Sequence, residues 1–141
     1  MASTIDRLYI DENGDKKFYD MLKSDEPFFK NYTGNKELFL FAMALGFKNQ
    51  ARVPFSGKRL GYFLEKDLKY EDYVLLNAIA INETESLDVL TDKEKIFKIA
   101  EEYAHGGVRL LQEEIGPGKF GSFSKNFELK LDQIIDKSEK N

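Results

Sequence analysis

His105 is the only histidine in this 141-residue chain, and Glu101 lies four residues before it. On a helix that spacing places both side chains on one face, where they could bind the same metal ion. A catalytic zinc site needs at least three protein ligands, and no third ligand lies nearby in the sequence. The stretch from Glu101 to Arg109 fits a solvated, charged helix face better, so we expect no metal site and no acid–base catalysis here.

Two further motifs resemble ligand-binding loops. The stretch Asp11 to Asp15 (DENGD) begins like a calcium loop, but Lys16 and Leu22 occupy the positions where an EF-hand needs glycine and a bidentate glutamate. Ser56-Gly57-Lys58 resembles part of a phosphate-binding loop, but the first glycine of that motif is missing and Arg59 follows the lysine. We expect a helix cap or turn at the first motif and an ordinary loop at the second.

No nucleophile–base pair can be placed along the chain, so we expect no catalytic residues, metal or cofactor. The chain has no cysteine, which removes disulfides, thiolate zinc sites and a cysteine nucleophile together. The acidic start lacks the apolar region of a secretory signal. No apolar run approaches the ~18 residues of a membrane span. These features fit a cytoplasmic protein that does not enter a membrane.

The charge of the chain is unevenly distributed. The net charge is −4, but residues 48–69 contain six basic and two acidic side chains, which leaves −8 on the remainder. A locally basic segment can contact phosphates, although an ordinary solvated loop has the same composition. The candidate nucleic-acid-binding residues are Lys48, Arg52, Lys58 and Arg59.

Gly106 and Gly107 lie inside an otherwise helical pattern. Two glycines in a helix cost about 2 kcal/mol relative to alanine, so the pair needs a reason. Close approach of another helix is the usual one, and a kink or a contact with a partner protein is the alternative. With Tyr103, these glycines form our candidate helix-packing or partner-contact site.

These residues must be positioned by helices. The stretch Asn35 to Phe47 (NKELFLFAMALGF) is apolar on every side, which predicts a central helix enclosed by protein, with Gly46 in the left-handed conformation at its end. Arg7 to Ile10 should form a short extended entry to the fold. We expect further helices from Asp11 to Lys23, from Glu71 to Glu83 and from Thr91 to Ile115. A hairpin that turns at Asn13-Gly14 is the alternative for the first of these. Pro54, Gly57 and Gly61 make residues 48–69 a loop or small hairpin that leads into a helical turn.

The expected fold is mainly α: a compact bundle of four to five helices around a buried central helix, with at most one small β-hairpin. The helix of residues 71–83 should be a second buried one. Thr91 and Glu94 fit a capping box for the next helix. Its expected inner residues are Ile96, Ile99, Ala100, Tyr103, Gly107, Leu110 and Leu111, and its expected outer residues are Lys98, Glu102, His105, Arg109 and Gln112. We expect residues 1–116 to form one domain, with 117–141 as a C-terminal extension whose helix packs on it.

Three stretches together resemble one protein family. They are ELFLFAMALGFKNQARVPF from Glu37, YFLEKD from Tyr62 and EEYAHGGVRLLQE from Glu101. They are similar to the small dnd system-associated proteins, found beside genes for DNA phosphorothioation and phosphorothioation-dependent restriction. That family similarly has an apolar helix that ends in LG, a basic loop with proline and a late EYANGG-like helix. His105 stands where the family pattern would have asparagine.

The resemblance implies a setting rather than a reaction, because none of the three stretches is a catalytic signature. It implies a non-enzymatic accessory protein of a DNA phosphorothioation and restriction defence system, acting by weak binding of DNA or of a partner complex. The alternative is a purely structural protein–protein adaptor or homo-oligomeric scaffold without nucleic-acid contact. Exposure of Arg52, Lys58 and Arg59 on one face would favour DNA, and an exposed apolar patch would favour the adaptor.

Overall fold

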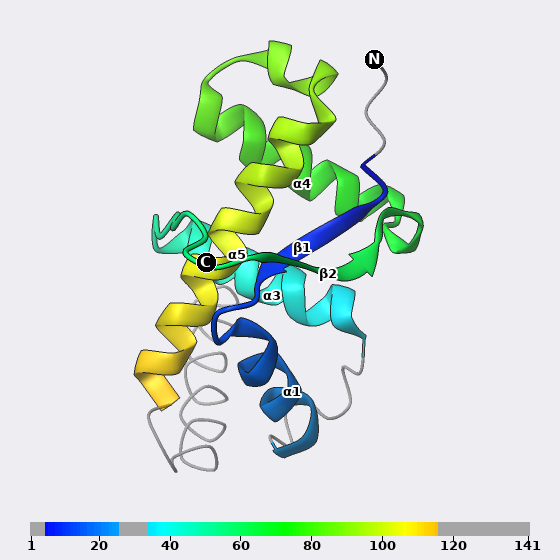
Figure 1. Cartoon of the computed structure of the whole chain (residues 1–141). Helices are drawn as coiled ribbons and strands as arrows, with labels where there is room; N and C mark the ends of the chain where they lie inside the picture. The colour runs from blue at the N-terminus through cyan, green and yellow to red at the C-terminus, as the bar shows by residue number, and fades with distance from the viewer. Residues whose placement is uncertain (1–4, 26–33, 116–141) are drawn as a thin grey trace, which may run out of the picture.

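The computed structural model describes residues 5–25 and 34–115, which form a mainly α-helical fold with a small antiparallel sheet (Figure 1). The elements in chain order are β1 (Arg7–Asp11), α1 (Asp15–Asp25), α3 (Asn35–Lys48), β2 (Arg59–Leu64), the short 3-10 helix η1 (Glu65–Asp67), α4 (Tyr70–Thr84), the 3-10 helix η2 (Leu87–Thr91) and α5 (Lys93–Ile115). The expected fold class is confirmed. The predicted C-terminal helix and the division at residue 116 lie outside the described residues.

The helix enclosed on every side is the middle of α5, where ten consecutive residues from Ile99 to Val108 are buried. α1, α3, α4, β1 and η2 all pack against α5 (Figure 1). The sequence predicted such enclosure for residues 35–47. In α3, however, Ala44 is exposed, and Phe41 and Leu45 are only partly buried. The buried side of α3 consists of Leu38, Phe39, Ala42, Met43 and Gly46.

Glycines allow α3 and α5 to approach each other closely. A Cβ on Gly107 of α5 would overlap the carbonyl of Ala42 in α3, and a Cβ on Gly46 of α3 would overlap the carbonyl of Tyr103 in α5. Gly46 therefore lies inside the helix and does not adopt the predicted left-handed end conformation. The left-handed residue after α3 is Gln50, with φ of 55°.

The two strands come from distant parts of the chain. β1 pairs with β2 in antiparallel register, with Arg7 opposite Leu64 and Asp11 opposite Arg59. The predicted extended entry at residues 7–10 is confirmed. The predicted helix start at Asp11 is wrong, because α1 begins at Asp15 after a turn in which Gly14 has φ of +96°. The alternative hairpin at Asn13-Gly14 is also wrong, because β1 pairs with β2.

The later helices begin and end close to the predicted residues. α4 spans Tyr70–Thr84 and α5 ends at Ile115. The cap of α5 is Asp92, whose Oδ1 accepts a hydrogen bond from the Lys95 N–H at 3.1 Å. The predicted cap, Thr91, belongs to η2 instead. None of the described helices combines the length and the apolarity that crossing a bilayer requires.

Candidate functional site

The middle of α5 places polar side chains inside the fold. Glu101, Glu102 and His105 are 2%, 8% and 3% exposed. The sequence placed Glu102 and His105 on the solvent-facing side of this helix, and that prediction is wrong. The reason is that β1, α1 and the loop of residues 49–58 cover this side of α5 and supply partners for its polar groups, as buried polar groups require.

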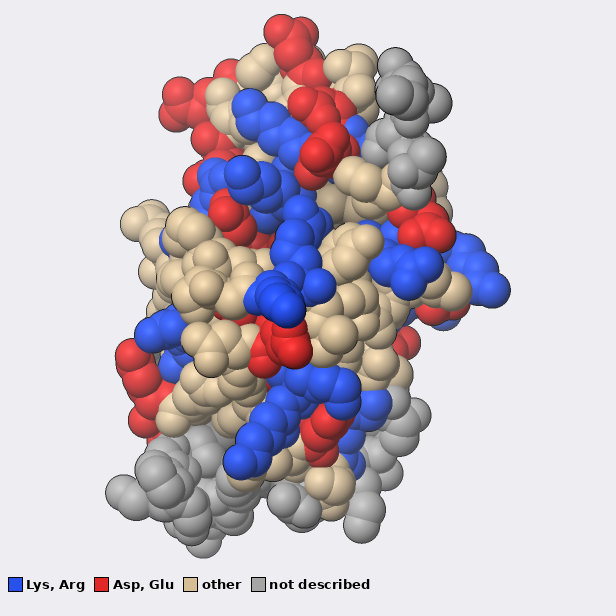
Figure 2. All heavy atoms as spheres, viewed as in Figure 1, with Lys and Arg blue, Asp and Glu red and all other residues tan. Residues whose placement is uncertain are grey.

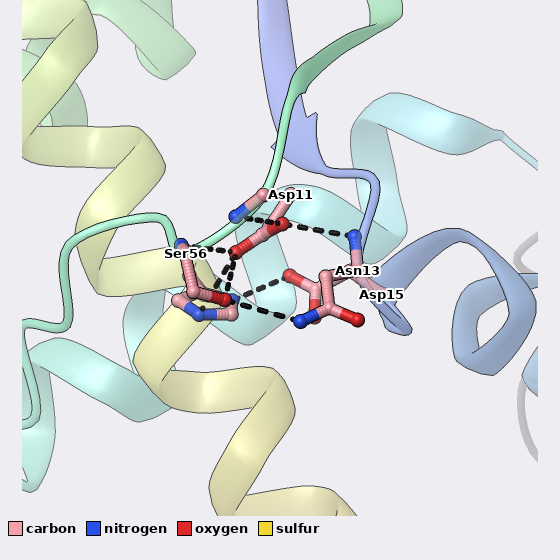
Figure 3. A network of polar contacts seen from close by, with 6 residues as sticks. Asp11, Asn13, Asp15 and Ser56 are labelled. Atoms are coloured by element: carbon pink, nitrogen blue, oxygen red, sulfur yellow. Dashed lines mark hydrogen bonds and ion pairs between the residues drawn. The ribbon is translucent and has the colours of Figure 1, made fainter.

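His105 lies between two buried aspartates (Figure 3). Its Nδ1 is 2.7 Å from Oδ2 of Asp15. Its Nε2 is 3.4 Å from Oδ2 of Asp11, without the geometry of a hydrogen bond. The ring of Phe55 packs edge-on against the imidazole. His105 therefore joins the end of β1 to the start of α1, whereas Glu101 faces Tyr9 and Arg59.

Asp11 fixes the loop that precedes β2. Its carboxylate accepts hydrogen bonds from the backbone N–H groups of Asn13 at 2.9 Å, Ser56 at 2.7 Å and Gly57 at 3.1 Å (Figure 3). Burial raises the pKa of Asp11, but these N–H donors and His105 outweigh it and leave the pKa below its ordinary value. A Cβ on Gly57 would lie 2.7 Å from Oδ1 of Asp11, so the loop needs glycine here.

Asp15 behaves differently from Asp11. Burial raises its pKa above the ordinary value, although the hydrogen bond from His105 and its charge oppose that shift. Its difference from Asp11 follows from the backbone donors that surround Asp11. The two aspartates hold one imidazole between them, one as a firmly ionised carboxylate and one that gains a proton more readily.

Glu101 forms a second buried contact with β1 and β2. Its carboxylate accepts the N–H of Tyr9 at 2.9 Å and lies 2.7 Å from the guanidinium of Arg59. Burial raises the pKa of Glu101 to about 7, although Arg59 and the Tyr9 N–H both oppose the shift. Arg59 also lies over the ring of Tyr9, 4.5 Å from its centre. Arg59 thus links β2 to α5 and to β1.

Glu102 forms a third contact, with Arg52. The Nε of Arg52 is 2.7 Å from Glu102, and its Nη1 is 2.7 Å from Glu83 at the end of α4. Tyr103 donates its hydroxyl to the other oxygen of Glu83. This bond and Arg52 lower the pKa of Glu83. Arg52 therefore bridges α4 and α5.

The four candidate DNA-binding residues thus divide into two pairs. All four residues are exposed, but Arg52 and Arg59 form ion pairs with glutamates of α5. On the face shown in Figure 2, lysine and arginine side chains run down the upper middle of the molecule, with acidic side chains beside and below them. A phosphate would have to compete with glutamates for both arginines.

Tyr103, Gly106 and Gly107 all lie inside the fold. The ring of Tyr103 packs edge-on against Phe47. A Cβ on Gly106 would overlap the carbonyl of Ala51, in the loop after α3, and Gly107 faces α3 as described above. The glycine pair therefore allows α3 and its following loop to contact α5 closely.

The buried cluster joins distant elements of the fold. The Ser56 hydroxyl is 3.3 Å from Oδ2 of Asp11, and among the described residues it forms no hydrogen bond with His105 of the kind that a nucleophile and its base share. Within residues 5–25 and 34–115, no group of three histidine, aspartate or glutamate side chains could hold a metal ion. The sequence signal for this cluster was weak, because the partners of α5 lie some 40 to 90 residues away in the chain.

A second candidate site lies on the outside of the molecule. The exposed large apolar side chains of the described residues are Tyr70 (82%), Val74 (50%), Leu75 (39%), Leu87 (69%) and Leu90 (45%). We call these five residues the α4–η2 apolar surface. The sequence predicted that residues 71–83 form a second buried helix. That is wrong for the outer side of α4, because only Leu76, Ile79 and Ala80 are buried there.

Comparison with known proteins identifies a family. Residues 13–137, most of the chain, match the family described as DNA sulphur modification system-associated protein 4. The resemblance drawn from the three sequence stretches is thereby confirmed. No curated protein and no solved structure matches the chain.

Proposed function

We propose, on the premise that the chain belongs to the DNA sulphur modification system-associated protein 4 family, that it is a non-enzymatic accessory protein of a DNA sulphur modification and restriction system. It acts in the cytoplasm by binding another protein of that system. The family match supports the setting, and the α4–η2 apolar surface supports the mode of action.

The observation that carries this proposal is the location of the exposed apolar side chains. All five large apolar side chains that the described residues leave exposed belong to Tyr70–Leu90. Single exposed apolar residues are ordinary, but a concentration of them on one part of a surface is typical of a protein–protein contact. Aromatic side chains such as Tyr70 are enriched in such contacts.

The charges favour a protein over DNA as the main partner. The chain has a net charge of −4, which opposes association with a polyanion. Arg52 and Arg59 already neutralise glutamates of α4 and α5. Transfer of these arginines to phosphates would take away the cations that pair with the buried Glu101 and Glu102, which opposes such a transfer.

The test is co-purification of the tagged protein from its native host, with and without nuclease treatment. We expect wild type to retain a protein of the modification system after nuclease treatment. The double variant Val74→Ser with Leu75→Ser should lose that protein, whereas Lys48→Gln with Lys58→Gln should retain it. Association that disappears on nuclease treatment of wild type would contradict the proposal.

A second candidate function is weak contact with duplex DNA through residues 48–69. Its support is the local charge of +4 and the exposure of Lys48 and Lys58. If these two lysines each neutralise a phosphate, log affinity should fall against log salt with a slope of about −2. Lys48→Gln with Lys58→Gln should abolish this binding without unfolding the protein. Absence of salt-dependent binding by wild type at low salt would rule it out.

A further inference from the structure

We infer that the α4–η2 apolar surface docks a partner protein whose own apolar side chains are flanked by lysines and arginines. This inference rests on the proposed function and adds the chemistry of the partner. It comes from two independent features of the same segment: which side chains α4 turns outward, and which charges surround them.

The outward side of α4 is almost entirely apolar. Tyr70, Val74 and Ala78 recur every four residues and are all exposed, which places them in one row along the helix. Leu75 is exposed beside that row. The exposed polar residues on this side are Glu71, near the start of the helix, and Asn82, near its end. The middle of the outward side therefore offers a partner about two helical turns of apolar contact.

Within residues 70–92 all charged side chains are acidic, and the exposed Lys69 and Lys95 lie just outside this segment. Residues 70–92 contain six acidic side chains and no lysine or arginine. Asp72 and Glu83 form ion pairs with Lys36 and Arg52. The other four, Glu71, Glu85, Asp88 and Asp92, are exposed. Figure 2 shows acidic side chains gathered at the end of the molecule where η2 and the start of α5 lie.

This charge selects among the occupants of the surface. Duplex DNA is disfavoured, because its phosphates would face four exposed carboxylates. A symmetric contact with a second copy is disfavoured, because the same carboxylates would meet across the interface. A protein with lysines and arginines around an apolar centre satisfies both features, since complementary charges at the rim of an interface raise the association rate and reject other partners.

The test uses the purified full chain and a labelled amphipathic helical peptide made of leucine and lysine, with binding followed by fluorescence anisotropy. The matched probe is the same peptide with glutamate in place of lysine. We expect the lysine peptide to bind, and to bind more weakly as salt rises. Val74→Ser with Leu75→Ser should weaken it at least about tenfold, because the peptide then loses apolar contact with two side chains.

Two matched charge variants distinguish binding at this surface from a general attraction of the basic peptide to an acidic protein. Glu71→Gln with Glu85→Gln should weaken the lysine peptide about threefold to tenfold, the sum of two exposed charge pairs. Glu12→Gln with Glu113→Gln, which removes two exposed carboxylates elsewhere, should leave its affinity unchanged.

The inference is overturned if the glutamate peptide binds as well as the lysine peptide, or if both charge variants have the same effect. It is equally overturned if a second copy, seen as a dimer by sedimentation, occupies the surface and excludes the peptide. If one of these peptide or dimer results occurs but the native protein partner is still retained after nuclease treatment, only this inference fails and the proposed function stands. If the peptides behave as expected but the native partner is lost on nuclease treatment, only the proposed function fails.

Discussion

The middle of α5 and the outer side of α4 reverse the usual distribution of side chains. The first buries Glu101, Glu102 and His105, while the second exposes Tyr70 and Leu75. The buried polar groups of α5 have partners within the chain, on β1, α1, β2 and the loop between α3 and β2. The outward side chains of α4 leave a large part of their surface to solvent. We infer that the first region holds the fold together and that the second serves binding.

The buried region should respond most strongly to loss of Asp11. Asp11→Ala leaves three backbone N–H groups without their acceptor and His105 without one of its carboxylates. We expect the free energy of unfolding to fall by about 3–5 kcal/mol in urea denaturation, the range for a broken buried network. Asp6→Ala is the control, because Asp6 pairs with Arg7 in solvent and its removal should leave the free energy of unfolding almost unchanged. Equal effects of the two variants would mean that the buried network around Asp11 contributes no more to stability than an exposed ion pair does.

The glycine contact between α3 and α5 should give the next largest effect. In Gly107→Ala the new Cβ overlaps the Ala42 backbone, which cannot move as a flexible side chain can. We expect a loss of about 3 kcal/mol, despite the better helix propensity of alanine. Gly61→Ala is the control: its Cβ would meet the flexible side chain of Arg7 at 3.0 Å. A Gly107→Ala protein as stable as wild type would mean that the two helices are not in close contact.

Glu101 predicts a pH dependence. Its pKa of about 7 is raised from 4.5, so the fold favours the protonated carboxyl. The contribution of the protonated Glu101 to the free energy of unfolding is fully present below pH 4.5. It is lost as the pH rises through about 7, by on the order of 2–3 kcal/mol. Glu101→Gln cannot ionise. Its free energy of unfolding relative to wild type should therefore rise between pH 4.5 and pH 8. A difference that stays constant across this range would show that Glu101 is ionised throughout.

The outer side of α4 should give the smallest effect on stability. Val74 and Leu75 are 50% and 39% exposed, so Val74→Ser with Leu75→Ser removes about half of the apolar burial that two core side chains would lose. We expect the free energy of unfolding to fall by about 1–2 kcal/mol. A loss comparable to that of Asp11→Ala would mean that these side chains belong to the core, and binding assays with the variant would then report unfolding.

The sequence predicted the local parts of this fold well. The bounds of α3 and α4 and the end of α5 follow from apolar runs and from residues that stop helices, which act over a few positions. The extended stretch of β1 was also predicted. Its partner was not, because pairing of β1 with β2 depends on contacts between segments about 50 residues apart.

The predictions that were wrong concern which parts of the fold cover each face of a helix. Apolar runs alone could not separate α3, which lies against α5, from α4, whose outer side is exposed. The polar residues of α5 led to the prediction that Glu102 and His105 face solvent. That prediction failed because the arginine and the aspartates that pair with them lie far away in the sequence. The basic segment of residues 48–69 was predicted from charge alone, and charge does not reveal that Arg52 and Arg59 face glutamates.

Hydroxyl-radical footprinting of the free protein and of its nuclease-treated native complex tests the central claim most directly. Tyr70 and Leu75 report on the α4–η2 apolar surface. Phe55, in the basic loop and partly exposed, reports on the other candidate surface. Our account predicts that oxidation of Tyr70 and Leu75 falls in the complex while that of Phe55 stays the same. Protection of Phe55 with unchanged oxidation of Tyr70 and Leu75 would contradict it.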